Sequence, residues 1–171
     1  MSPRPPSDIL TVQQRKPGPR GPRKARITVP QASGLSLLQN GRVDRLSAVG
    51  DVYQEWERRN YRAGLDLYDP AITLEVHTPI PEAGVYEGLE GLQRYMRGFL
   101  ETWDVYEIHA TELEADGDLV IVDVHHRGRA SEALVEMDYI TVWTFQGDRV
   151  ARMDIGRDRE RLVAAASRHL A

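Results

Sequence analysis

The chain of 171 residues contains no cysteine, and it has no run of about eighteen apolar residues. The first absence excludes disulfide bonds, thiolate nucleophiles and zinc sites with cysteine ligands. The second predicts that no segment spans a membrane. The N-terminal residues also lack the apolar stretch of a secretory signal. We therefore expect a soluble, cytoplasmic protein, and the length is typical of one domain.

Motifs that would bind metals or cofactors are also missing. The sequence has no H-E-x-x-H or similar spacing of ligands, so we expect no metal site and no cofactor. The net charge is −4, which argues against nucleic acid as the main partner.

Charge and proline are distributed unevenly. Residues 1–26 carry seven basic side chains against one acidic one, a net charge of +6 that leaves −10 for the remainder, and seven of the ten prolines fall in residues 1–30. Such a segment cannot bury a core. We predict a disordered basic tail over residues 1–40 and a folded domain over residues 41–171. The tail is either an arm for a polyanion, a solvated extension, or sequence that precedes the true start.

Apolar periodicity predicts the elements of the domain. Helical spacing indicates helices over residues 42–59 and 61–68, a third helix with an apolar stripe over 92–103, and a last helix over 158–169. Alternation indicates strands over 72–77, 84–88, 105–113, 119–127, 133–145 and 149–155. Because the late strands are joined by tight turns, we expect antiparallel pairing. The fold class is α+β, with the helices on one face of the sheet.

Four stretches carry a resemblance to a known family. They are residues 67–70 (Leu-Tyr-Asp-Pro), 85–92, 142–150 and 158–160 (Asp-Arg-Glu). In this order the chain resembles the SnoaL-like, nuclear-transport-factor-2-like superfamily over about residues 43–170. The resemblance implies a cystatin-like cone, in which a curved, antiparallel-rich sheet wraps around three to four helices and leaves a deep apolar pocket. It also implies a homodimer.

Enzymes of this superfamily offer only a partial match. In the resembling ketosteroid isomerases a carboxylate abstracts a proton and a neutral acid holds the enolate oxygen. The corresponding positions here are Val76 and Thr141, which are unsuited to these roles. The Asp-Arg-Asp set of limonene epoxide hydrolases is not present at matching positions. His126 shares the parity of three valines and is predicted to point inward, either as a wall residue or as a general base.

Strand parity also predicts the lining of the pocket. Met137, Tyr139, Thr141 and Trp143 share one face of the long strand, and they are joined as expected ligand contacts by Trp56, Tyr95, Trp103 and Met153. Asp138, Ile140 and Val142 share the outer face. Exposed apolar residues there would support a dimer interface. Glu75 and His77 lie on the face opposite Leu74 and Val76, and we expect them either to form a surface pair or, if the strand bulges, to line the rim of the pocket.

Three functions remain open at this point. The first is a small-molecule-binding protein whose apolar cone pocket performs no fixed chemistry. The second is an isomerase or polyketide-cyclase-like enzyme that uses His126 as acid or base. The third is a dimeric scaffold module. The missing carboxylates favour the first, with an apolar small molecule as the ligand.

Overall fold

The computed structural model describes residues 44–80 and 82–170. The predicted disordered tail over residues 1–40 lies outside these residues. The described part of the chain forms three α-helices and six strands. In chain order they are α1 (Arg45–Glu57), β1 (Tyr68–Val76), β2 (Gly84–Glu87), α2 (Gly88–Glu101), β3 (Val105–Asp116), β4 (Leu119–Ala130), β5 (Ala133–Gln146), β6 (Arg149–Gly156) and α3 (Arg159–Leu170).

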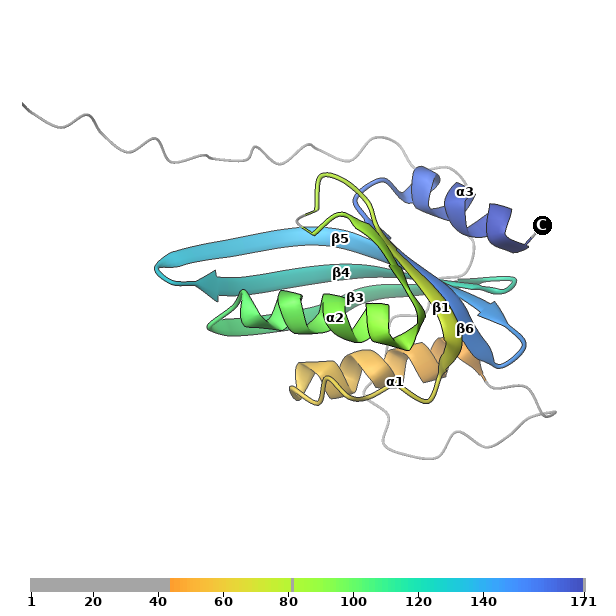
Figure 1. Cartoon of the computed structure of the whole chain (residues 1–171), viewed down its shortest axis with the longest axis horizontal. Coiled ribbons are helices and arrows are strands. Elements are labelled where there is room, and N and C mark those ends of the chain that lie inside the picture. Colours follow the sequence, from red (N-terminus) through yellow and green to blue (C-terminus); the bar gives the residue numbers. More distant parts are fainter. Residues whose placement is uncertain (1–43, 81, 171) are drawn as a thin grey trace, which may run out of the picture.

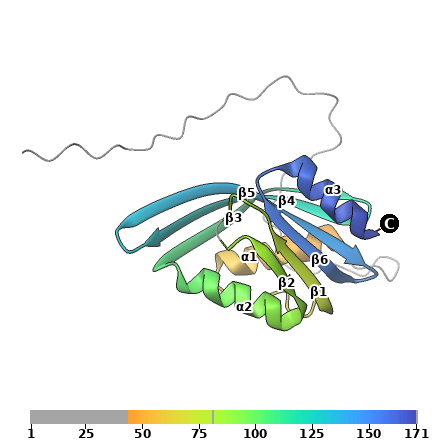
Figure 2. The same ribbon diagram turned by 45° about the horizontal axis from the view of Figure 1, so that its top comes forward.

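The six strands form one sheet in the order β2-β1-β6-β5-β4-β3. All neighbouring pairs are antiparallel except β1 and β6, which are parallel. Figure 2 shows the sheet curving around α1 and α2, with β3, β4 and β5 extending past the shorter strands. The predicted α+β class and its cone-shaped, antiparallel-rich sheet are confirmed.

The helices lie on both faces of the sheet, not on one as predicted. Helices α1 and α2 cover the inner face and α3 covers the outer face (Figure 1). The large core lies between the sheet and the first two helices, where Val49, Tyr53 and Leu92 meet the inward residues of every long strand. A smaller core joins Leu162 and Ala166 of α3 to the outer face. The inner layer therefore holds most of the buried apolar surface.

The helix predicted over residues 61–68 is wrong. This segment is a series of turns whose backbone amides bond three residues back, from Ala63 to Asn60 and from Leu67 to Gly64. Gly64 has φ of +87°, and a Cβ atom there would lie 2.8 Å from Val52. This left-handed conformation favours glycine and interrupts a helix. The first strand consequently begins earlier than predicted, at Tyr68.

The outer face does not offer the exposed apolar residues from which we expected support for a dimer. Val142 is fully buried and packs with Leu162 of α3, and Ile140 is half-buried beside it. The reason is that α3 folds back over β5 and β6. A homodimer stays a prediction that rests on the resemblance alone.

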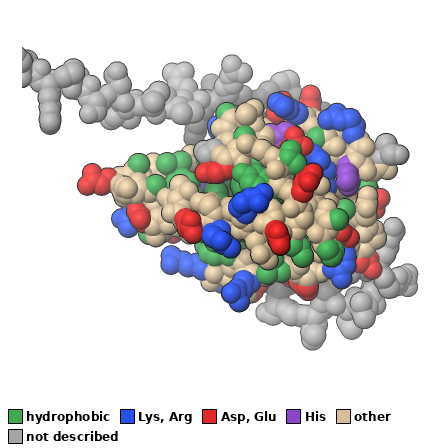
Figure 3. Space-filling model, in the orientation of Figure 1, with side chains coloured by type: hydrophobic (Ala, Val, Ile, Leu, Met, Phe, Trp, Pro, Cys, Tyr) green, Lys and Arg blue, Asp and Glu red, His purple; other side chains and the backbone are tan. Residues whose placement is uncertain are grey.

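No helix within residues 44–80 and 82–170 is long and apolar enough to cross a bilayer. On the face of the molecule seen in Figure 3, basic and acidic side chains are interspersed. This face therefore carries no extended patch of one sign. The expectation that nucleic acid is not a partner stays a prediction.

Candidate functional site

A cavity lies between α1, α2 and the inner face of the sheet. It offers about 30 Å³ to the centres of water-sized molecules, which is enough for about two or three waters. Seven of its twelve lining side chains are aromatic and none is charged. The aromatic ones are Tyr53, Trp56, Tyr61, Tyr95, Phe99, Tyr106 and Tyr139, and the others are Met96, Ile108, Thr141, Met153 and Ile155.

The cavity has a buried floor and a half-buried rim. Tyr53, Tyr139 and Thr141 belong to the floor and are at most 8% exposed. The rim is formed by Phe99 and three other half-buried side chains: Tyr61, Met96 and Tyr106. Burial raises the pKa of Tyr53, Tyr95, Tyr106 and Tyr139. These phenols are therefore neutral around pH 7, and the cavity is an uncharged space with hydroxyl groups in its wall.

Three side chains of the floor region form a hydrogen-bonded chain. The Nε1 atom of Trp143 donates to Oγ1 of Thr141 at 3.0 Å, and this oxygen lies 2.7 Å from the hydroxyl of Tyr53. When Thr141 donates its proton to Tyr53, the phenol proton of Tyr53 is free to point into the cavity. The arrangement can thus present one hydrogen-bond donor to an oxygen atom of a ligand.

His126 lies directly behind the cavity wall, at the end where α2 finishes. It is 0% exposed and points inward, as predicted. Its ring is surrounded by Trp103 and Tyr106, each with centroids 4.8 Å away, and by Phe99 at 5.7 Å and Tyr139 at 6.4 Å. Neither ring nitrogen has a hydrogen-bond partner among the residues that the structure describes. Burial, and to a smaller extent the charge of His125, lower the pKa of His126 to about 4, so the imidazole is neutral at pH 7.

Trp103 covers His126 from the connection between α2 and β3. The indole nitrogen of Trp103 is also buried without a partner. Gly128 on β4 makes this position possible, because a Cβ atom there would clash with the indole and would lie 2.8 Å from Nε2 of His126. The strand predicted over residues 119–127 thus continues through Gly128, and the turn falls on Ser131 and Glu132.

The structure places the eight predicted ligand contacts in three locations. Five of them line the cavity together, namely Trp56, Tyr95, Tyr139, Thr141 and Met153. Trp103 and Met137 lie near His126 instead, since Met137 is its partner across the strands. Trp143 does not line the cavity. It is fully buried behind it and stacks on Tyr68 with centroids 5.8 Å apart.

Seven lining residues were not predicted. Tyr53, Met96 and Phe99 lie on the apolar stripes of two helices, and Tyr106 and Ile108 share the parity of one strand. The same periodicity that predicted the other residues applies to these, so they were detectable. Tyr61 and Ile155 complete the set, and Tyr61 was hidden by the incorrect helix over residues 61–68.

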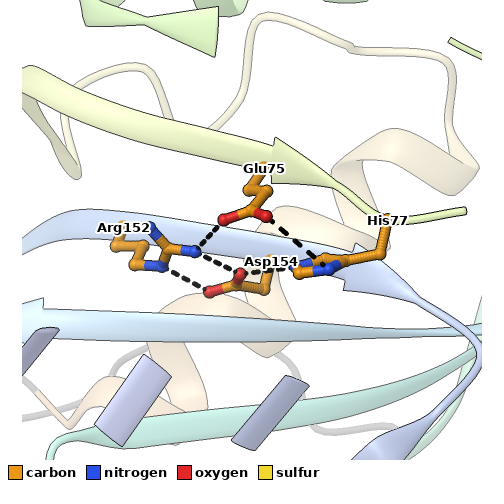
Figure 4. Close-up of polar contacts among 4 residues, drawn as sticks. All are labelled: Glu75, His77, Arg152 and Asp154. Atoms are coloured by element: carbon orange, nitrogen blue, oxygen red, sulfur yellow. Dashed lines mark hydrogen bonds and ion pairs between the residues drawn. The ribbon is translucent and has the colours of Figure 1, made fainter. Parts of the chain in front are cut away.

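A second cluster of polar side chains lies on the opposite face of the sheet, between β1 and β6 (Figure 4). Asp154 is 0% exposed and accepts hydrogen bonds from Nε and Nη2 of Arg152 at 2.8 and 2.6 Å. His77 is 7% exposed, and its Nε2 lies 2.9 Å from Oδ1 of Asp154. Glu75 receives a further hydrogen bond from Arg152. The surface pair predicted for Glu75 and His77 is therefore part of a larger, mostly buried network.

This cluster contains residues of the kinds that bind metals. Glu75, His77 and Asp154 place their potential ligand atoms within 4.8 Å of one another. Arg152, however, already supplies a positive charge to both carboxylates, and Nδ1 of His77 lies 3.7 Å from Glu75. Burial acts to raise the pKa of Glu75, but Arg152, His77 and Arg161 together lower it. We interpret the cluster as an ion-pair network that joins the two parallel strands.

Comparison with known proteins supports the fold. The chain is similar to an NTF2-like protein from Burkholderia thailandensis E264, with 26% identity, a TM-score of 0.61, and coverage of 71% of this chain and 95% of that one. It is similar to a putative SnoaL-like polyketide cyclase from Jannaschia sp. CCS1, with 17% identity, a TM-score of 0.59, and coverage of 77% and 97%. It is also similar to TerC, which was co-crystallised with polyporic acid, with 15% identity, a TM-score of 0.58, and coverage of 71% and 96%.

The sequence itself matches a family model. A search of curated proteins found no match, but residues 49–153 match the model of the SnoaL-like domain. This range contains most of α1 and β6 and every element between them. The chain therefore belongs to the SnoaL-like domain family.

Proposed function

We propose that this protein binds a small, uncharged, largely apolar organic molecule in the cavity between α1, α2 and the sheet. The observation that carries this proposal is the lining of the cavity, which has seven aromatic rings and no charged side chain. Burial of apolar ligand surface against such walls is favourable. A charged ligand would lose its hydration there without gaining a counter-charge.

The size and polarity of the cavity limit further which ligands it can bind. The cavity in its present shape holds only a few waters, so a ligand with one ring requires the half-buried rim side chains to move. The hydroxyl pair of Tyr53 and Thr141 supports recognition of one oxygen atom. TerC, one protein with this fold, was co-crystallised with a small organic molecule, which agrees with a binding role for the cone.

The test uses p-xylene as a neutral probe and p-toluate as its anionic counterpart. We expect isothermal titration to show binding of p-xylene, and no binding of p-toluate at the same concentration. In Ile108→Phe the added ring atoms fill the cavity and should abolish binding. The matched control is Ile140→Phe on the outer face, which should bind p-xylene as the wild type does. Equal binding of both probes, or equal binding by Ile108→Phe, would contradict the proposal.

His126 favours a second candidate function, an enzyme that removes a proton from a carbon atom next to a carbonyl group. The supporting observation is a neutral, fully buried imidazole without a partner beside the cavity. A neutral imidazole with a free nitrogen is in the protonation state that a general base requires. The test is deuterium exchange into 2-tetralone in D₂O, followed by NMR. We expect exchange to be faster with the wild type than with His126→Gln, and equal rates would exclude this role.

A further inference from the structure

Two buried polar side chains next to the cavity lack hydrogen-bond partners. They are His126, with both ring nitrogens, and Trp103, with its indole nitrogen. A buried polar atom without a partner costs about 1–3 kcal/mol, and such atoms are rare in folded proteins. Three of them in two touching rings indicate a position that is completed by a group outside residues 44–80 and 82–170.

The two side chains are adjacent to the proposed ligand. Phe99, Tyr106 and Tyr139 line the cavity on one side and pack around His126 on the other. His126 is therefore separated from the cavity by the thickness of one ring. Trp103 packs edge-on against His126 and also contacts Phe99, with centroids 6.1 Å apart.

The Trp103 side chain is held against His126 by ring contacts alone. It is half-buried, and its indole makes ring contacts but no hydrogen bond. The backbone beside it is fixed, since the amide of Asp104 donates to the carbonyl of Arg129 at 2.7 Å. Phe99, which is half-buried and lies between the cavity and His126, is the ring whose rotation would open the cavity toward both side chains.

The unpartnered atoms define the chemistry of the missing group. A neutral imidazole has one donor and one acceptor nitrogen, and an indole has a donor only. A hydroxyl group can serve the acceptor nitrogen of the imidazole and the indole nitrogen together, because it donates to the first and accepts from the second. The other imidazole nitrogen lies on a different edge of the ring and is not reached by the same group. A ketone or a carboxylate only accepts, and an ammonium group only donates, so each would serve just one member of this pair.

We propose that His126 and Trp103 form a hydroxyl-binding subsite at the α2 end of the cavity, so that the ligand is a hydroxylated ring compound such as a phenol. The proposal rests on the proposed function, because the ring of the ligand occupies the aromatic cavity. The hydroxyl group reaches His126 when the Phe99 side chain turns aside, and Trp103 donates to the hydroxyl oxygen. The Tyr53 and Thr141 pair is left for a second oxygen atom of a larger ligand and is not the anchor for this hydroxyl.

The experiment compares p-cresol with p-xylene, which has a methyl group in place of the hydroxyl. Affinities are measured by isothermal titration on the full chain. We expect wild type to bind p-cresol about 10-fold more tightly, as two ordinary hydrogen bonds would give. His126→Phe and Trp103→Phe should each reduce this advantage to less than about threefold, whereas Tyr86→Phe, which removes a hydroxyl outside the cavity, should retain it.

The outcomes separate the two proposals. Binding of p-xylene without an advantage for p-cresol would overturn the subsite and leave the cavity function standing. Binding of neither compound would overturn both. An advantage that survives in His126→Phe but is lost in Tyr53→Phe would place the hydroxyl at the other end of the cavity and would also overturn the subsite.

A spectroscopic measurement on wild type keeps the test independent of the folding of the variants. In protein labelled with ¹⁵N-histidine, p-cresol should shift the ring nitrogen resonances of His126, and p-xylene should shift them much less. The solvent-exposed His169 is the internal control and should not respond to either compound. Unchanged His126 resonances at saturating p-cresol would contradict the proposal.

Discussion

The protein buries two histidines on opposite faces of one sheet, and their surroundings differ completely. On the outer face, the ring nitrogens of His77 each face a carboxylate, and Arg152 balances both acids. On the inner face, His126 is enclosed by aromatic rings and has no partner for either nitrogen. Both side chains are buried, but His77 has a partner for each ring nitrogen and His126 has none among the described residues.

This difference separates a structural network from a binding site. A satisfied buried network stabilises one arrangement of its strands and has no atom left for a ligand. An unsatisfied one costs free energy in the absence of a ligand, so it is retained only where another role compensates. The outer cluster contains more residue types associated with catalysis, but the inner cavity is the better candidate for function.

The largest effect is expected on the outer face, from Arg152→Met. This variant leaves the buried Asp154 without its counter-charge and should lower the free energy of unfolding by about 3–5 kcal/mol. Urea denaturation measures the loss. Arg127→Met is the control, because Arg127 pairs with Glu136 at the surface, and it should cost less than about 1 kcal/mol. Equal stability of Arg152→Met and wild type would contradict the assignment of the outer cluster as a stabilising ion-pair network.

The next effect is the pH dependence caused by His126. The pKa is 6.5 in a model peptide and about 4 in the folded protein, so only the unfolded chain takes up a proton between these values. Stability contributed by neutral His126 is complete above about pH 6.5 and falls by about 3 kcal/mol as the pH decreases to 4.

Replacement by a ring that does not titrate isolates this contribution. His126→Phe should lose less stability than wild type between pH 6.5 and 4, as measured by urea denaturation at each pH. His169→Gln, a change at an exposed histidine, should follow wild type. Parallel curves for wild type and His126→Phe would show that His126 is already protonated or solvated in the folded state.

A smaller effect is expected from Gly128→Ala, which tests whether Trp103 lies against His126. The added methyl group would clash with the indole and should cost about 1–3 kcal/mol. Gly98→Ala in α2 has nothing within 4 Å of the new atom and should be neutral or stabilising by up to about 1 kcal/mol. Thermal unfolding of the two variants gives the answer, and an unperturbed Gly128→Ala would place Trp103 elsewhere.

The smallest effect is expected from Tyr53→Phe, which removes the hydroxyl that meets Thr141. The loss of one buried hydrogen bond should cost about 1 kcal/mol of unfolding free energy. Tyr86→Phe, which removes a half-buried hydroxyl bound to the carbonyl of Glu82, is the control and should cost less. A larger loss in Tyr86→Phe would contradict the assigned role of the Tyr53–Thr141 pair.

The sequence predicted the faces of the strands better than the depth of the side chains. Alternation along β5 correctly assigned Tyr139 and Thr141 to the inner face and Asp138 to solvent. It also assigned Trp143 to the inner face but could not show that α1 covers this end of the strand. Tyr53 and Trp56 pack on the Trp143 ring, and the indole is therefore part of the core and not of the lining.

The sequence could not predict which segments far apart in the chain contact one another. Parity correctly placed Glu75 and His77 together on the outer face, but Arg152 and Asp154 join them only because β1 and β6 pair in parallel. Local patterns contain no information about that pairing. The position of α3 on the outer face was missed for the same reason, since its apolar side could pack on either face of the sheet.

Entry of a ligand into the inner cavity is tested most directly by methyl NMR with p-xylene. The methyl groups of Met96, Met153 and Ile108 line the cavity, while Ile121 and Ile140 belong to the core beneath α3. We predict that a titration with p-xylene shifts the first three resonances and leaves the other two unchanged. Shifts confined to Ile121 and Ile140, or no shifts at saturating p-xylene, would contradict the account.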